Sequence, residues 1–308
     1  MVQYDVAIVG GGPAGLAAAA YLVRAGRSTV IVGKTLGGKV TYPFSLRDLA
    51  EVDGVWGAEL TYQLEEFVRS HDPMLVEDNV ATTVRNDDGS FTLTLESDGS
   101  ALTANAVLIA TGARSKRTIV EGELDYWGRG VSFSSISHAQ HFAGRDVAVI
   151  GDGPRALVAG LELASVARRV NLVTPRLGDL SGLPGAEQVL RHPAVSIFSN
   201  WEVQSIVGDD FVTAIQLVGI NGEVRQLPVE GVFVQLELLP NNDMVRGLVD
   251  FDERGHIAIN QRCETSMPGI FAAGDVTNIH AELVPIALGE GAKAAVSAWE
   301  YLVMTERA

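Results

Sequence analysis

The hydrophobic pattern near the start of the chain predicts a strand, a helix and a second strand in close succession. Apolar residues run without interruption from Val6 to Val9, as in a strand that is buried on both faces. A glycine-rich turn follows, then a stretch rich in alanine and leucine that is patterned for a buried helix, then an apolar strand ending at Val32. The segment from Tyr4 to Gly33 therefore predicts a βαβ unit.

A second unit of the same kind lies in the middle of the chain. The apolar strand from Asp146 to Ile150 runs into Gly151-x-Gly153-x-x-Ala156. A chain of 308 residues can bury two hydrophobic cores. The pattern therefore predicts an α/β fold with two Rossmann-like dinucleotide-binding domains.

The first glycine turn has the spacing of a phosphate-binding turn. Gly10 permits the tight turn, Gly12 lets the backbone approach a pyrophosphate, and Gly15 lets helix and strand pack closely. The N-terminus of the helix then directs free N–H groups at the phosphates, although a tight turn without a ligand is an alternative interpretation. No acid follows Val32 to hold a ribose, which weakens the case for NAD at this turn but does not exclude FAD.

A carboxylate follows an apolar strand near the C-terminus. The segment from Pro268 to Val276 places this strand before Gly274 and Asp275, and an Asp there can accept hydrogen bonds from sugar-alcohol hydroxyls or serve as a turn residue. The segment from Leu283 to Leu302 predicts a helix with small residues along one face. Its N-terminus, at Leu283 and Val284, can direct positive potential at a flavin pyrimidine, where reduction builds negative charge.

Charge and cysteine content narrow the function classes. The net charge of −15 argues against binding to nucleic acid or to an anionic membrane, because both need a basic face. No leader segment and no apolar stretch of membrane-spanning length is present, so we expect a cytoplasmic protein. Cys263 is the single cysteine and cannot form an internal disulfide or a metal cluster. We therefore predict no metal site, and redox chemistry requires a cofactor.

Several motifs occur in a characteristic order: Gly10 to Gly15, Gly37-Gly38, Ala110-Thr111-Gly112, "GVFVQLELLPNN" and "GIFAAGDV". With this series the chain resembles the thioredoxin reductase family, including the flavoprotein component of alkyl hydroperoxide reductase, over essentially its whole length. The resemblance implies a homodimer with non-covalent FAD, the glycine turn on the pyrophosphate and Asp275 on the ribityl chain. The predicted cofactor-binding residues are Gly10, Gly12, Pro13, Ala14, Gly15, Gly38, Lys39, Ala110, Thr111, Gly112, Gly274, Asp275, Leu283 and Val284.

The resemblance also implies a domain layout in which the second domain is inserted in the first. Residues 1–116 and 240–308 would form a discontinuous FAD-binding domain, and residues 117–239 an inserted NAD(P)-binding-like domain.

The inserted domain departs from the family in its nicotinamide site. Members that use NADPH usually carry a basic cluster for its 2′-phosphate, but Arg176 is the only basic residue in the segment 170–182. The strand in this segment also does not end in the carboxylate that would favour NAD. Asp152 places a negative charge in the glycine turn, which Arg155 could offset. NAD(P)H binding is therefore doubtful, and we expect an electron donor other than NADPH.

Two serines stand where thioredoxin reductases carry their Cys-x-x-Cys dithiol. Ser134 and Ser137 occupy these positions, and a hydroxyl can neither supply a thiolate nor cycle through a disulfide. Either the dithiol was lost naturally or both cysteines were replaced deliberately. His138 follows where the family commonly has an acid, and with an ordinary pKa near 6.5 it would donate a proton, unless it is a solvent-facing loop residue.

Three function classes remain open. The first is an FAD-dependent oxidoreductase of the thioredoxin reductase type, which reduces a thioredoxin-like disulfide if the serines replace cysteines. The second is a dithiol-free flavin electron-transfer protein, which resembles the ferredoxin-linked reductases and would need a basic surface for an acidic ferredoxin at residues 114–117 or 168–169. The third is a non-catalytic flavin-binding homologue.

Overall fold

The computed structural model describes residues 3–49, 57–175, 180–279 and 281–305. The chain divides into two compact units. The first unit comprises residues 1–41, 56–114 and 239–308, and the inserted unit comprises residues 42–55 and 115–238. The layout expected from the sequence assigned residues 42–55 to the FAD-binding domain instead.

The first unit is built on one sheet with the strand order β3-β2-β1-β6-β5-β4, and β17 pairs with β6. The strands are β1 (Gln3–Val9), β2 (Thr29–Val32), β3 (Met74–Val76), β4 (Val80–Arg85), β5 (Phe91–Leu95), β6 (Ala101–Ile109) and β17 (Ile270–Ala272). Strands β1, β2, β3, β6 and β17 run parallel, whereas β4 and β5 form antiparallel pairs. The helices are α1 (Pro13–Arg24), η1 (Gly38–Thr41), α2 (Ala58–Ser70), η3 (Asp243–Val245) and α7 (Val284–Thr305).

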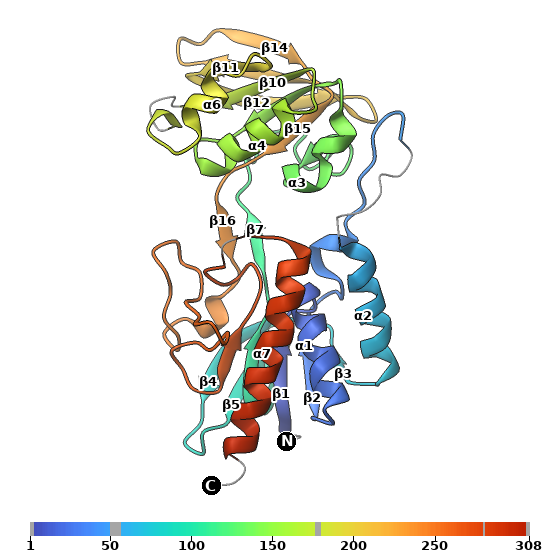
Figure 1. Cartoon of the computed structure of the whole chain (residues 1–308), viewed down its shortest axis with the longest axis vertical. Coiled ribbons are helices and arrows are strands. Elements are labelled where there is room, and N and C mark those ends of the chain that lie inside the picture. The colour runs from blue at the N-terminus through green and yellow to red at the C-terminus, as the bar shows by residue number, and fades with distance from the viewer. Residues whose placement is uncertain (1–2, 50–56, 176–179, 280, 306–308) are drawn as a thin grey trace. The chain divides into compact units, whose positions relative to one another are not determined.

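The predicted small-residue helix is α7, and it packs closely on α1 (Figure 1). A Cβ added to Gly291 of α7 would lie 2.0 Å from the Ala14 carbonyl oxygen, so only glycine permits this approach. The buried alanines of α7 include Ala287, Ala294 and Ala298. The small face predicted from the sequence is therefore the face that contacts α1.

The inserted unit contains a parallel sheet with the order β11-β10-β9-β15-β8 and an antiparallel sheet with the order β12-β13-β14. The strands are β8 (Val131–Ser132), β9 (Asp146–Ile150), β10 (Arg169–Thr174), β11 (Val195–Ser199), β12 (Trp201–Gly208), β13 (Val212–Gly219), β14 (Val224–Pro228) and β15 (Gly231–Val234). The helices are α3 (Ser135–His138), η2 (Ala139–Phe142), α4 (Pro154–Ala164) and α6 (Ala186–Leu190). Strands β7 (Ala113–Ser115) and β16 (Leu238–Pro240) pair where the chain passes between the units.

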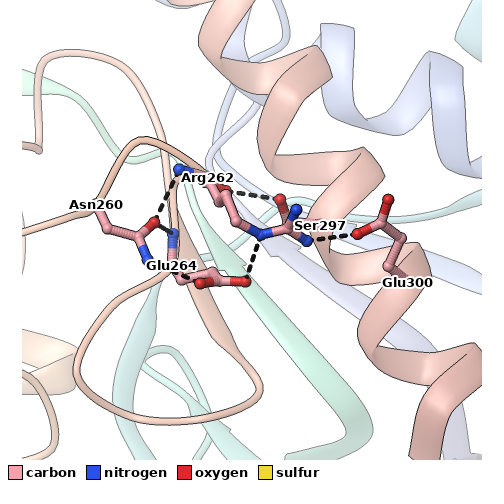
Figure 2. A network of polar contacts seen from close by, with 5 residues as sticks. All are labelled: Asn260, Arg262, Glu264, Ser297 and Glu300. Atoms are coloured by element: carbon pink, nitrogen blue, oxygen red, sulfur yellow. Dashed lines mark hydrogen bonds and ion pairs between the residues drawn. The ribbon is translucent and has the colours of Figure 1, made fainter.

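A polar network fixes the turn before β17 to α7 (Figure 2). The guanidinium of Arg262 contacts Glu264 at 3.0 Å and also Glu300 of α7. The hydroxyl of Ser297 donates to the Arg262 carbonyl oxygen at 2.7 Å, and Asn260 Oδ1 accepts from the Arg262 N–H at 2.8 Å. The network ties the turn that leads into β17 to the C-terminal half of α7.

Cys263 lies inside this turn. It adopts a left-handed backbone with φ of 59°, its side chain is fully buried, and its thiol donates to the Glu290 carbonyl oxygen at 3.7 Å. Burial and the nearby Glu290 carboxylate raise the pKa of the thiol to about 11. A buried thiol that stays protonated acts as a packing residue.

Candidate flavin site and serine loop

The glycine turn after β1 is packed backbone against backbone. Gly10 has a φ of 111°, and a Cβ on it would lie 2.3 Å from the Ala110 carbonyl oxygen. A Cβ on Gly15 would lie 1.9 Å from the Gly10 carbonyl oxygen. Neither position accepts a side chain, which agrees with the tight turn and close helix packing expected from the motif.

Gly12 differs from the other two glycines because its missing side chain faces open space. A Cβ on Gly12 meets no atom of the described residues within 4 Å. Gly12 is the N-cap of α1, Pro13 begins the helix, and the first turn carries no acid. The N–H groups of this helix end are thus available to an anion on the side that Gly12 leaves clear.

A lysine and an aspartate meet near this helix end. Lys39 Nζ lies 2.6 Å from Asp275 Oδ2, and the carboxylate side chain is only 14% exposed. Gly274 has a φ of 77° and packs on Ala14, since a Cβ there would lie 3.2 Å from the Ala14 Cβ. The Lys39–Asp275 pair could not be predicted from sequence because the two residues come from distant segments.

Gly38 completes this cluster. Its φ is 62°, and a Cβ on it would lie 3.0 Å from the Cα of Gly12. The structure therefore brings the first glycine turn, the Gly37-Gly38 turn and the Gly274-Asp275 segment into one place, although the motifs are far apart along the chain.

The Ala-Thr-Gly segment is held by a residue that the sequence analysis did not single out. Thr111 Oγ1 donates to the Asn241 carbonyl oxygen at 2.5 Å, and the Asn241 side chain donates back to the Thr111 carbonyl oxygen at 3.1 Å. The Asn241 N–H also donates to the Gly112 carbonyl oxygen at 3.0 Å. Asn241 belongs to the "LLPNN" motif, which was the only signal available for it.

The residues predicted at the start of the last helix lie at its N-terminus. Helix α7 begins at Val284, one residue after Leu283, whose carbonyl oxygen accepts the Ala287 N–H at 2.9 Å. Val284 also packs on Gly57, where a Cβ would lie 2.9 Å from Val284 Cγ1. The helix end is therefore fixed against the N-terminus of α2.

The serine loop lies in the inserted unit. Ser134 is the N-cap of α3 and accepts the Ser137 N–H at 3.4 Å. The Ser134 hydroxyl donates to the Ser137 hydroxyl at 2.9 Å. The two side chains thus point toward each other from the first turn of the helix, as two residues three apart do when the first caps the helix.

His138 is packed differently from what the sequence suggested. Its Nδ1 lies 2.8 Å from the Ser132 hydroxyl, and its ring stacks on Phe44 with centroids 3.9 Å apart. Burial, with a smaller contribution from His141, lowers the pKa of His138 from 6.5 to about 4. The expectation of an ordinary pKa therefore fails, because a largely dehydrated imidazole resists protonation and is neutral at pH 7.

The second glycine turn has one closely packed glycine and one open glycine, like the first. A Cβ on Gly151 would lie 2.5 Å from the Gln235 carbonyl oxygen, while a Cβ on Gly153 meets none of the described atoms within 4 Å. Asp152 is exposed and lies outside the first turn of α4, which carries no acid. Arg176, the one basic residue considered for a 2′-phosphate, lies outside the described residues.

Three residues of the basic segments considered as a ferredoxin surface form ion pairs. Arg117 pairs with the buried Glu123 at 3.0 Å, and Arg168 pairs with Asp146 at 2.8 Å. Lys116 lies 3.8 Å from Glu237. These contacts reduce the positive charge available to an acidic partner.

Metal-binding clusters and membrane-spanning helices are both absent from the described residues. Within those ranges, no group of three or more His, Cys, Asp or Glu residues is placed to hold a metal ion. No helix in the same part of the chain is long and apolar enough to cross a membrane.

Comparison with known proteins identifies the family. A family model described as "Pyridine nucleotide-disulphide oxidoreductase" matches residues 4–291. The chain belongs to this family. The family resemblance and the two-domain α/β fold expected from the sequence are thereby confirmed.

Two curated relatives and one solved structure illustrate the similarity. The chain is 34% identical to the F component of alkyl hydroperoxide reductase from Pseudomonas putida, over 98% of its own length and 59% of that protein's length. It is 34% identical to a Bacillus subtilis protein named NADH dehydrogenase, over 97% of this chain and 59% of the relative. The thioredoxin reductase of Streptococcus pyogenes matches with a TM-score of 0.85 and 28% identity, covering 98% of this chain and 99% of that one. The chain thus spans 59% of the length of these two curated relatives.

Proposed function

We propose that this protein is an FAD-dependent oxidoreductase of the thioredoxin reductase type. The observation that carries the proposal is the open space over Gly12 at the N-terminus of α1, with the Lys39–Asp275 pair gathered beside it. A helix end that is free of acids and cleared of side chains fits a pyrophosphate. When bound, FAD supplies the redox chemistry that the protein's own side chains lack.

The residues of the cradle have distinct tasks in this proposal. The backbone N–H groups of the first turn of α1, which follow Gly12 and Pro13, would hold the pyrophosphate. The carboxylate of Asp275 would accept hydrogen bonds from the ribityl hydroxyls. Lys39 orients that carboxylate through its 2.6 Å contact. The N-terminus of α7 at Val284 provides positive potential for the charge that builds on the flavin pyrimidine.

The acceptor depends on residues 134 and 137. With cysteine at both positions the protein would reduce a thioredoxin-like disulfide, and the facing side chains, whose oxygens lie 2.9 Å apart, support such a pair. With serine at both positions, as in this chain, the protein cannot exchange dithiols. The serines favour a second candidate function, which is flavin electron transfer without a dithiol.

The donor we propose is NADH rather than NADPH. The support is the open glycine turn before α4 and the similarity to a relative named NADH dehydrogenase. The paired state of Arg117 and Arg168 makes an acidic ferredoxin a weaker candidate.

The proposal is tested first by flavin content. Purified protein should show the visible absorbance of FAD, and Gly12→Val should lose it because the new side chain enters the space for the pyrophosphate. Gly182→Val is a matched control, since its Cβ also meets no described atom within 4 Å and it lies in the inserted unit. A wild-type protein that cannot be reconstituted with FAD would overturn the proposal.

The donor is tested by anaerobic stopped-flow reduction of the bound flavin. NADH should bleach the flavin band faster than NADPH at equal concentration. Faster reduction by NADPH would refute the proposed donor without affecting the proposed flavin site.

A further inference from the structure

Gln235 lies at the end of β15, beside the second glycine turn. Its N–H donates to the Ile150 carbonyl oxygen at 2.8 Å, next to Val234 and Ile150, the last pair of the parallel ladder between β15 and β9. A Cβ on Gly151 would lie 2.5 Å from the Gln235 carbonyl oxygen. Gln235 therefore adjoins the first glycine of the turn that leads into α4.

The direction of the Gln235 side chain follows from strand alternation. Phe233 packs in the same cluster as Ala156 and Leu157 of α4, whereas Val234 packs on the opposite face of the sheet. Side chains two apart in a strand share a face. Gln235 directly follows Val234 and its N–H still bonds to β9, so by this alternation we expect its side chain on the face that α4 covers, near the N-terminus of α4.

The amide of Gln235 is buried and lacks a partner. The residue is 4% exposed, and within the described parts of the chain its Nε2 has no hydrogen-bond partner. A buried amide without a partner destabilises a folded protein, and native structures contain few of them. An acceptor supplied by a ligand would remove this cost.

The fold indicates the class of ligand. The chain builds β9, β10 and β11 in one direction across the sheet and then adds β15 on the other side of β9. A ligand in a sheet of this kind lies at the carboxyl ends of the strands, at the point where the order reverses. A dinucleotide crosses this point with its pyrophosphate on the helix N-terminus, its adenosine half toward β10 and its other half toward β15.

We propose that Gln235 is a binding residue of the inserted unit, which donates its Nε2–H to an acceptor oxygen on the half of a dinucleotide that extends beyond the pyrophosphate over β15. The inference rests on the proposed function, because it assigns the dinucleotide donor to this unit. It goes beyond the proposed function because it names the side chain that binds the dinucleotide and the half of the dinucleotide that this side chain contacts.

The test is Gln235→Met in the FAD-loaded protein, titrated with NAD⁺ and separately with AMP by isothermal calorimetry. Methionine keeps the length of the side chain and removes the donor. NAD⁺ affinity should fall about tenfold, the equivalent of one good hydrogen bond, while AMP affinity should stay unchanged because AMP lacks the half that Gln235 contacts. The ligand-free variant should show an unchanged or higher Tm, because an unpaired buried amide has been removed.

Gln226→Leu is the matched control, because Gln226 is exposed on β14. It should leave both affinities unchanged. Gln235→Glu keeps the shape of the side chain and removes the amide donor. It should lower NAD⁺ affinity at least as much as Gln235→Met, and it replaces that variant in the test if the methionine variant does not fold.

Three results would overturn the inference: unchanged NAD⁺ affinity in the Gln235 variants, equal weakening of NAD⁺ and AMP, or no NAD⁺ binding by the wild type. In each case a wild-type protein that still holds FAD leaves the proposed flavin function standing. Protein that takes up no FAD contradicts the proposed function instead.

Discussion

Replacing His138 should change how the stability of the protein depends on pH. The imidazole contacts the Ser132 hydroxyl through Nδ1 and stacks on Phe44, and burial lowers its pKa to about 4. In the unfolded chain the same group has a pKa of about 6.5. The folded state therefore binds its proton less readily than the unfolded state does, and stability is lost as pH falls below the unfolded value.

The size of the effect follows from the two pKa values. The full loss, reached below about pH 4, is about 3 kcal/mol, since each tenfold difference in proton affinity is worth about 1.4 kcal/mol. Between about pH 7.5 and about pH 5 the loss is about 2 kcal/mol, because at pH 5 the folded imidazole is still mostly neutral while the unfolded one is charged.

The assay compares wild type with His138→Asn by urea unfolding at both pH values and a fixed FAD concentration. Asparagine can still contact Ser132 and does not titrate in this range. Between about pH 7.5 and about pH 5, the free energy of unfolding of the wild type should fall by about 2 kcal/mol more than that of the variant. Phe44→Leu should remove the ring stack, hydrate the imidazole and raise its pKa toward 6.5, as NMR titration of the ring proton would show. Equal losses in wild type and His138→Asn would refute the reasoning.

Three further predictions concern the serine pair at positions 134 and 137, the native Cys263 and the Arg262 network. In the double variant Ser134→Cys/Ser137→Cys, oxidation should form a disulfide, so that only the thiol of Cys263 remains titratable. The chemically reduced flavoprotein form of this variant should then reduce a thioredoxin-like disulfide. Neither single variant should do so, because both cysteines are needed for dithiol exchange. Failure to form the bond in a folded, flavin-loaded variant would exclude dithiol chemistry in this loop. Native Cys263 should react with a thiol reagent at about pH 8 far more slowly than in urea, because burial keeps it protonated with a pKa of about 11; rapid native labelling would contradict this. Ser297→Ala should lower the free energy of unfolding in urea by about 1 kcal/mol, because it removes the partly buried hydrogen bond to the Arg262 carbonyl oxygen. Glu300→Gln should lower it by less because its ion pair is exposed, and the reverse order would contradict this prediction.

The pattern of the sequence identified the local units because their chemistry is local. The run Val6–Val9, the three glycines after it and the helix from Pro13 lie within one short segment, and the close contacts of Gly10 and Gly15 are made inside the same unit or to its neighbouring strand. The strand predicted at residues 146–150 has the same bounds as β9. Such elements can be predicted because steric demands on a turn select glycine wherever the turn occurs.

Other features of the sites depend on residues that are distant in sequence. Nothing adjacent to His138 reveals that Phe44 covers it, and the sequence alone therefore suggested an ordinary pKa. Burial is a property of packing, and packing here involves the segment 42–49, which the sequence pattern did not assign to the inserted unit.

The sequence by itself determined the fold class, the family and the presence of serine at positions 134 and 137, because glycine spacing and residue identity are read directly from the chain. Only the tertiary structure decided that Lys39 pairs with Asp275, that Asn241 holds the Thr111 segment and that Gln235 is buried without a partner among the described residues. The physical reason is that hydrogen bonding, ion pairing and desolvation act through space, between segments whose separation along the chain carries no information about their contact.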